Sequence, residues 1–166
     1  MPQNLEMKAV FPDLRSAAAI AKNLGARSKG ILSQKDIYFD IPRGRLKLRI
    51  LNKRNCELIA YTRPNSSGGR YSTYRILPGR DAAAAERFYA GIFDTCVIVK
   101  KKRRLFLYKN ARIHLDTVEQ LGNFVEFEVA VTHGRKQAVK LFQELAGAFG
   151  IKGSQTIEGS YGDMLM

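Results

Sequence analysis

The stretch that decides the fold is RIHLDTVEQLGNFVEFEV, residues 112–129. Near its end, Glu126 and Glu128 alternate with Phe127 and Val129. Strict alternation predicts a β-strand with one apolar face and one charged face, because successive side chains of a strand point to opposite sides. The apolar face is typical of a core. The charged face needs another explanation, since carboxylates are scarce in this chain.

The composition is that of a basic globular chain. Its 166 residues include 28 Lys and Arg against 15 Asp and Glu, which gives a formal net charge of +13. This excess favours a polyanionic partner, such as nucleic acid, an acidic membrane surface or a phosphorylated small molecule. A generally basic, solvated surface is the alternative interpretation.

The length predicts one domain over residues 1–166. No apolar run approaches the roughly 20 residues of a membrane span, and no signal peptide is recognisable, so a membrane partner is not expected. Cys56 and Cys96 have no metal-binding spacing and are expected to be free thiols. We therefore expect a cytoplasmic protein. The sequence leaves the oligomeric state open, a homodimer included.

Short alternating segments dominate the chain, and three amphipathic helices interrupt them. Helices are predicted from the N-cap Asp13 to Gly25, over 81–93 and over 134–149. Lys109-Asn110 suits a tight hairpin turn between two long strands. The predicted strands cover 4–10, 27–33, 35–40, 45–52, 57–63, 71–77, 96–108, 111–118 and 123–132.

Adjacent antiparallel strands with few helices predict an α+β fold, and many such strands in a small domain tend to close into a barrel. We expect a closed antiparallel β-barrel of about eight strands with helices packed outside. The apolar strand faces would then contact the helices, and the charged faces would line the lumen. An open sheet with a solvated charged face is the alternative.

A lumen rich in cations is unfavourable when empty, because like charges repel and lose solvation. A bound polyanion reverses this, since each charge-assisted contact to a phosphate contributes on the order of 1.5–3 kcal/mol. Glu126 and Glu128 point the same way and would repel phosphate unless a metal lies between them. Paired carboxylates suit Mg²⁺ or Mn²⁺, which also bind substrate phosphates.

Six short motifs follow one another along the chain: residues 4–8, Lys47-Leu48-Arg49, Lys101-Lys102-Arg103, residues 112–122, Glu126-Phe127-Glu128 and Gly159-Ser160-Tyr161. In this order they resemble the ExExK, basic-strand, KxR, RxHLDxVxxLG, ExE and terminal motifs of the CYTH family, the class IV adenylyl cyclase and thiamine triphosphatase group of triphosphate tunnel enzymes. The resemblance covers nearly the whole chain.

The resemblance implies a barrel of about eight strands and a role for each matched residue. Glu6, Glu126 and Glu128 would bind Mg²⁺ or Mn²⁺, and Asp116 would help to orient the metal. Lys8, Arg112 and Asp116 would be catalytic. The residues implied to hold the triphosphate are Lys8, Lys47, Arg49, Arg63, Arg75, Lys101, Arg103 and Arg112.

Two positions depart from the family pattern. Asn4 replaces a metal-side glutamate, which would weaken a metal site or change the metal bound. Tyr61 stands where many members have a lysine, which would relax the phosphate grip or change the accepted substrate size. His114 is a candidate general base, and a hydrogen-bonded structural histidine is the alternative.

The resemblance implies a metal-dependent enzyme that either cyclises ATP with release of pyrophosphate or hydrolyses a triphosphate, and the sequence leaves this choice open. A non-catalytic module that binds nucleotide or polyphosphate is a rival, supported by Asn4. Binding of nucleic acid through an outer patch of Lys100, Lys102 and Arg104 is a weaker rival, because aromatic residues do not interleave with the cations.

Overall fold

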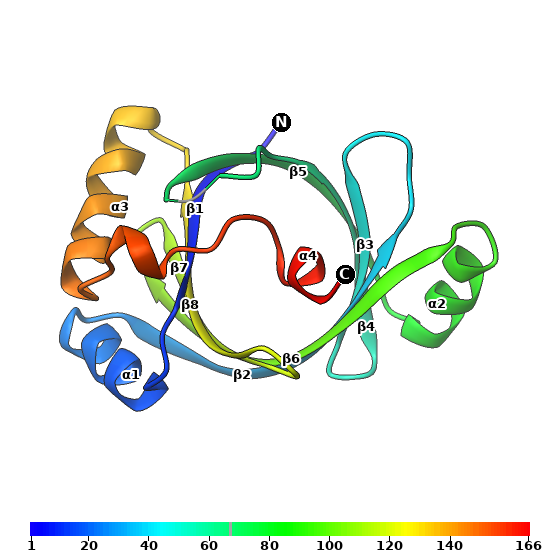
Figure 1. Ribbon diagram of the computed structural model, residues 1–166, viewed down its shortest axis with the longest axis horizontal. Coiled ribbons are helices and arrows are strands. Elements are labelled where there is room, and N and C mark those ends of the chain that lie inside the picture. The colour runs from blue at the N-terminus through cyan, green and yellow to red at the C-terminus, as the bar shows by residue number, and fades with distance from the viewer. Residues whose placement is uncertain (67) are drawn as a thin grey trace.

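The computed structural model describes residues 1–66 and 68–166. Within this part of the chain, eight strands form a closed antiparallel barrel in the order β1-β5-β4-β3-β2-β6-β7-β8, and β1 pairs with β8 to close it (Figure 1). The α+β barrel predicted from the sequence is therefore confirmed. The strands are β1 (Gln3–Val10), β2 (Arg27–Phe39), β3 (Arg45–Leu51), β4 (Asn55–Thr62), β5 (Arg70–Gly79), β6 (Thr95–Tyr108), β7 (Ala111–Val118) and β8 (Gly122–Ala130).

Helices cover the barrel on two opposite sides (Figure 1). On one side lie α1 (Leu14–Asn23) and α3 (Arg135–Ala148), and on the other lies α2 (Ala82–Ala90). The short helix α4 (Tyr161–Leu165) follows a 3-10 turn at Gly153–Gln155 and lies across one opening of the barrel. None of the helices in the described ranges is long and apolar enough to cross a membrane.

The apolar strand faces point outward against the helices, as the alternation predicted. One cluster joins α1 and α3 to β1, β7 and β8, and its fully buried members include Phe106, Val125 and Phe127. A second cluster joins Ala82 of α2 to Leu48 and other residues of β2, β3 and β4. Burial of these faces leaves the other face of each strand to line the lumen.

One strand prediction needs a correction. The segments 27–33 and 35–40 form a single strand, β2, whose pairing with β6 shifts register between Ser28 and Ile31. Gly30 lies in this bulge with φ +85°, a conformation that glycine adopts without strain. The hairpin turn at Lys109-Asn110 is confirmed, since β6 ends at Tyr108 and β7 begins at Ala111.

An apolar cluster occupies lumen-facing positions near α4. It consists of Tyr38, Val99, Val118 and Phe124 from the barrel wall with Tyr161 from α4. The helix is anchored by a capping box, in which Ser160 Oγ accepts from the backbone N–H of Asp163 at 3.1 Å. The C-terminal segment is thus fixed against the lumen and contributes a tyrosine to it.

Candidate active site

The lumen contains a polar cavity of about 210 Å³. Of the residues predicted for the site, Asp116 lies fully buried in the adjoining wall on β7. The predicted residues that line this cavity are Glu6, Lys8, Lys47, Arg49, Arg63, Lys101, Arg103, Arg112, Glu126 and Glu128. With the other lining residues included, side chains from all eight strands converge on this space, in the way that alternation alone had suggested.

Arg75 is the exception among the predicted cations. It is exposed on the outer face of β5, where its Nε lies 2.7 Å from the sulfur of Met1. The lumen-facing positions of this strand are Ser72, Tyr74 and Ile76, so the face assigned to residues 71–77 is off by one residue. A shift of one residue reverses every side chain of a strand. We therefore leave Arg75 out of the candidate site.

Asp36, which the sequence did not single out, organises three of the predicted cations. Its carboxylate accepts from Lys47 Nζ at 3.0 Å and from Lys101 Nζ at 3.1 Å, and Arg49 donates to it through Nε and Nη2, each at 2.8 Å. Burial alone would raise the pKa of Asp36, but Arg49, Lys101 and Lys47 lower it well below its ordinary value. Asp36 is thus a buried anionic anchor for one wall of the cavity.

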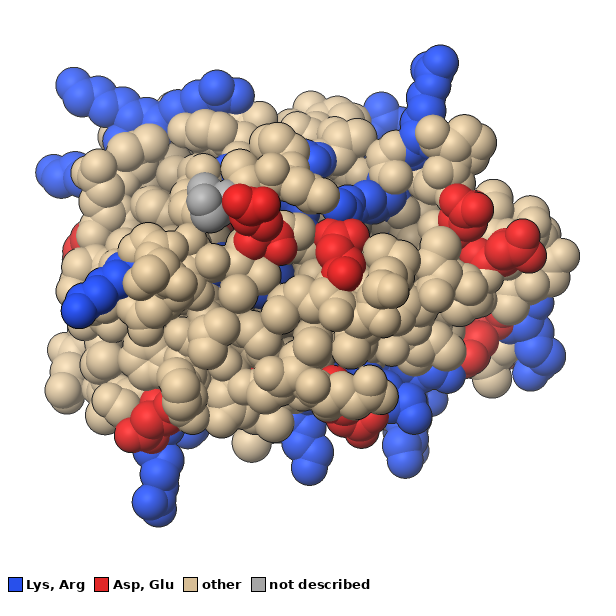
Figure 2. Space-filling model, in the orientation of Figure 1, with Lys and Arg blue, Asp and Glu red and all other residues tan. Residues whose placement is uncertain are grey.

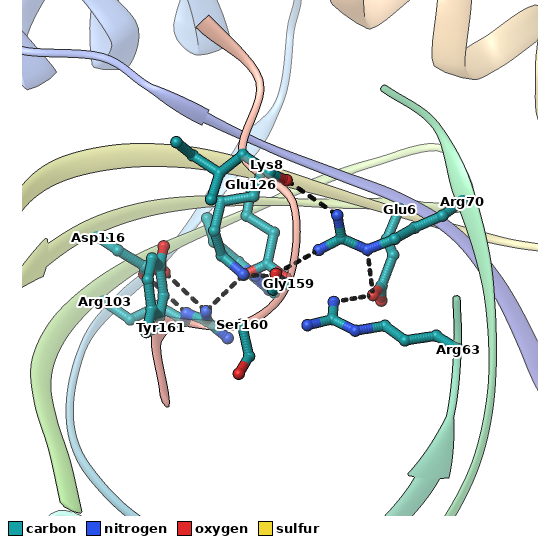
Figure 3. Close-up of polar contacts among 12 residues, drawn as sticks. Glu6, Lys8, Arg63, Arg70, Arg103, Asp116, Glu126, Gly159, Ser160 and Tyr161 are labelled. Carbon is teal, nitrogen blue, oxygen red and sulfur yellow. Dashed lines mark hydrogen bonds and ion pairs between the residues drawn. The ribbon is translucent and has the colours of Figure 1, made fainter. Parts of the chain in front are cut away.

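A second cluster surrounds Arg103. This guanidinium donates to both carboxylate oxygens of Asp116, at 2.8 and 2.7 Å, and to Glu126 Oε2 at 2.9 Å (Figure 3). Tyr161 donates its hydroxyl to Asp116 at 2.7 Å. Burial raises the pKa of Asp116, but Arg103 outweighs it and lowers the pKa to about 2. Asp116 is therefore held as a carboxylate that fixes Arg103, and no contact places it among candidate metal ligands within the described ranges.

Glu6 belongs to a third cluster, on the other side of the cavity. Its Oε1 accepts from Arg63 at 2.5 Å and lies 3.6 Å from Arg70 Nε (Figure 3). Burial, with help from Glu126 and Glu128, raises the pKa of Glu6. Arg70 is a buried cation that sequence reasoning missed. It also donates to the carbonyl oxygens of residues 66, 157 and 159, which ties the C-terminal segment to the barrel.

Lys8 lies between these groups. Its Nζ is 3.7 Å from Glu126 Oε1 and 4.1 Å from the ring centre of Tyr161. Burial lowers the pKa of Lys8 to about 8. The side chain is therefore a cation that loses its proton more readily than an exposed lysine, and an added anion would favour its charged form.

The donor atoms that best fit a metal ion come from β7 and β8. One ligand atom from each of His114, Glu126 and Glu128 lies within 4.8 Å of the others. Glu128 is partly exposed and, among the described residues, has no ion-pair partner within 4 Å. Glu6 is outside this group because its carboxylate is directed to Arg63 and Arg70. The residues present thus fit a divalent ion at Glu126 and Glu128, with oxygen ligands of the kind such ions prefer.

The two departures from the family pattern both line the cavity. Tyr61 lies with its ring centre 5.7 Å from Lys47 Nζ and 5.5 Å from Arg63 Cζ, so it faces cations from one side of the lumen. Asn4 lies where the cavity meets a groove of about 530 Å³. The groove shares Asn4, Tyr74, Arg112 and Glu128 with the cavity and continues it past Arg27 and Tyr108.

The cavity accounts for only part of the basic character of the chain. Its lining holds seven Lys and Arg side chains and four Glu side chains, whereas the whole chain carries a net charge of +13. Figure 2 shows Lys and Arg side chains projecting from the outer edges of the molecule. Most of the excess charge is therefore outside the lumen.

The chain belongs to the CYTH domain family, whose model matches residues 2–161. Among curated protein sequences there is no match. Solved structures share the fold. The PH1012 protein of Pyrococcus horikoshii is 23% identical with a TM-score of 0.84, and the alignment covers 96% of this chain and 98% of that one.

Two further structures have names that mention an activity. A candidate adenylate cyclase from Vibrio parahaemolyticus is 17% identical with a TM-score of 0.80, covering 98% of this chain and 97% of that one. A candidate adenylyl cyclase from Hippeastrum, described as having a dominant triphosphatase activity, is 15% identical with a TM-score of 0.67, covering 96% and 91%. At these identities the likeness establishes the fold.

Proposed function

We propose that this protein is a divalent-metal-dependent enzyme that hydrolyses a triphosphate held in the barrel lumen. The observation that carries the proposal is the enclosed cavity, where cations from several strands face Glu126 and Glu128. Membership of the CYTH family and the triphosphatase activity described for the Hippeastrum protein support a triphosphate substrate. Cyclisation of a nucleoside triphosphate is the alternative reaction of the same site.

The cations would hold the phosphates through donors that their internal partners leave free. Arg49 uses Nε and Nη2 for Asp36, and its Nη1 has no hydrogen-bond partner in the described part of the chain. Lys47 and Lys101 each give Asp36 one contact and retain further N–H groups. Asp36 therefore fixes these side chains while donors remain for phosphate oxygens, which is the pre-organised electrostatic environment that phosphoryl transfer requires.

Glu126 and Glu128 would hold the metal, which when bound neutralises phosphate charge and lowers the pKa of a bound water. Arg112 is exposed beside Glu128 at the cavity mouth, because their backbones are paired across β7 and β8. It would bind an outer phosphate. The cavity of about 210 Å³ is small for a whole nucleotide, so the organic part of a substrate would extend into the adjoining groove.

The experiment that tests the proposal is ³¹P NMR of ATP, GTP, thiamine triphosphate and tripolyphosphate incubated with the protein and Mg²⁺ or Mn²⁺. We expect metal-dependent release of inorganic phosphate. Cyclic nucleotide with pyrophosphate would instead establish the cyclase reaction. Tight binding without turnover of any of these compounds would contradict an enzyme and favour the non-catalytic module.

A further inference from the structure

A buried imidazole lies beside the two candidate metal-binding glutamates without a hydrogen bond at one of its nitrogens. His114 is 3% exposed, and its Nδ1 has no hydrogen-bond partner among the described residues. Glu126 Oε2 is the nearest carboxylate oxygen recorded for this nitrogen, and at 3.6 Å it lies beyond hydrogen-bonding distance. An unsatisfied buried polar atom costs on the order of 1–3 kcal/mol, so its presence needs an explanation.

The hydrogen-bonded structural histidine considered from the sequence does not supply that explanation for Nδ1. The imidazole instead lies in the one group of potential metal ligands found in the described part of the chain, with a ligand atom within 4.8 Å of those of Glu126 and Glu128. A metal ion between these atoms would give a partner to His114 Nδ1 and to Glu128, which lack one in the described part of the chain. A neutral imidazole nitrogen is a common metal ligand in proteins.

The other carboxylates of the cavity lining, Glu6 and Glu57, do not belong to this group of ligand atoms, and Asn4 lacks a carboxylate. Glu6 accepts from Arg63 at 2.5 Å and faces Arg70. Asn4 stands two residues before it on the same face of β1, with an amide in place of a carboxylate. Among the His, Cys, Asp and Glu side chains of the described ranges, His114 is the one grouped with Glu126 and Glu128, so the third protein ligand is a nitrogen.

We infer that His114, Glu126 and Glu128 form a mixed nitrogen–oxygen site that takes a first-row transition-metal ion, such as Mn²⁺, in preference to Mg²⁺. The inference rests on the proposed function, since it specifies the metal of the same cavity. Imidazole ligands favour transition metals, whereas Mg²⁺ favours an all-oxygen shell with several waters. Arg103 would yield its contact to Glu126 while remaining fixed on Asp116 through two hydrogen bonds.

The test is spectroscopic and uses the metal alone. The protein is loaded with Mn²⁺, binding is measured from the EPR signal of free Mn²⁺, and pulsed EPR is used to detect imidazole ¹⁴N coupled to the bound ion. The chain has two histidines, and His133 is exposed before α3. His133→Gln is therefore the matched control for His114→Gln, and melting temperatures check that both variants are folded.

We expect the ¹⁴N coupling in the wild type and in His133→Gln, and its loss in His114→Gln together with at least about a tenfold weaker affinity for Mn²⁺. If His114→Gln does not fold, coupling in His133→Gln still assigns the ligand, because only one imidazole remains. Bound Mn²⁺ without imidazole coupling would overturn the inference and leave the proposed function intact. Failure of the wild type to bind Mn²⁺ at all would overturn the metal dependence as well.

Discussion

Replacing Asp36 with asparagine is the sharpest perturbation of the barrel interior, because it removes a charge and hardly changes the shape. The carboxylate is 1% exposed and pairs with Lys47, Arg49 and Lys101 at 2.8–3.1 Å. Breaking a buried pair by removing one partner costs about 3–5 kcal/mol, since the remaining charges are left uncompensated. For a chain of this size that corresponds to a fall in melting temperature of roughly 6–20 °C.

The assay is thermal unfolding at neutral pH followed by circular dichroism. The control is Asp40→Asn, which changes an exposed aspartate just beyond the end of the same strand and should alter stability by less than about 0.5 kcal/mol. A fall in melting temperature below about 2 °C for Asp36→Asn would refute the anchoring role.

Wild type and Asp36→Asn can also be compared as a function of pH, and the direction of the change in their stability difference is predicted. Because the three cations outweigh burial and lower the pKa of Asp36 in the folded state, its contribution is fully present above the unfolded-state pKa of about 3.9. It is lost as the pH falls through the lower folded-state pKa. The gap between wild type and Asp36→Asn should thus be constant from about pH 5 to 8 and narrow below about pH 4. A gap that widens on acidification would contradict this reasoning.

Three further predictions concern the ligands. Glu128→Ala should reduce metal-dependent phosphate release at least about 100-fold, because a metal ligand is lost. The melting temperature should change little, because Glu128 has no ion-pair partner in the described ranges. Unchanged turnover would exclude its metal role. Arg49→Ala should raise the apparent KM for tripolyphosphate about 10- to 150-fold, because a charge-assisted contact is lost. Arg75→Ala, on the outer face, should leave this KM unchanged. Equal effects of the two substitutions would contradict the assigned faces. Tripolyphosphate with Mn²⁺ at 100 times its Kd should raise the melting temperature by about 5–11 °C through mass action, and no shift would argue against binding to the folded state.

The barrel was predictable because each strand carries its own signal. Alternation in segments such as 45–52 and 123–132 assigns an apolar and a charged face without any knowledge of the partner strand. The apolar faces must be buried together against the helices. The charged faces are then left to line one shared lumen inside a closed barrel. The bulge in β2 was less visible, since Gly30 marks it only by a backbone conformation.

The parts that the sequence did not reveal depend on a single residue of register or on contacts between strands. Arg75 and Arg70 lie on opposite faces of β5, and the poor alternation of that segment gave no guide to which one enters the lumen. Asp36 is one polar residue among several in β2, and its role follows only from cations on β3 and β6. The pairing of Glu6 with Arg63 likewise depends on the order of the strands, which puts β5 between β1 and β4 and brings the residue after β4 close to β1.

The central claim is that the lumen itself binds the triphosphate, and a crystal structure with tripolyphosphate and Mn²⁺ tests it most directly. We predict phosphate oxygens within hydrogen-bonding distance of Arg49 and Arg112, and the ion at Glu126 and Glu128. Tripolyphosphate bound only on the outer basic surface, with these side chains still paired among themselves, would contradict it.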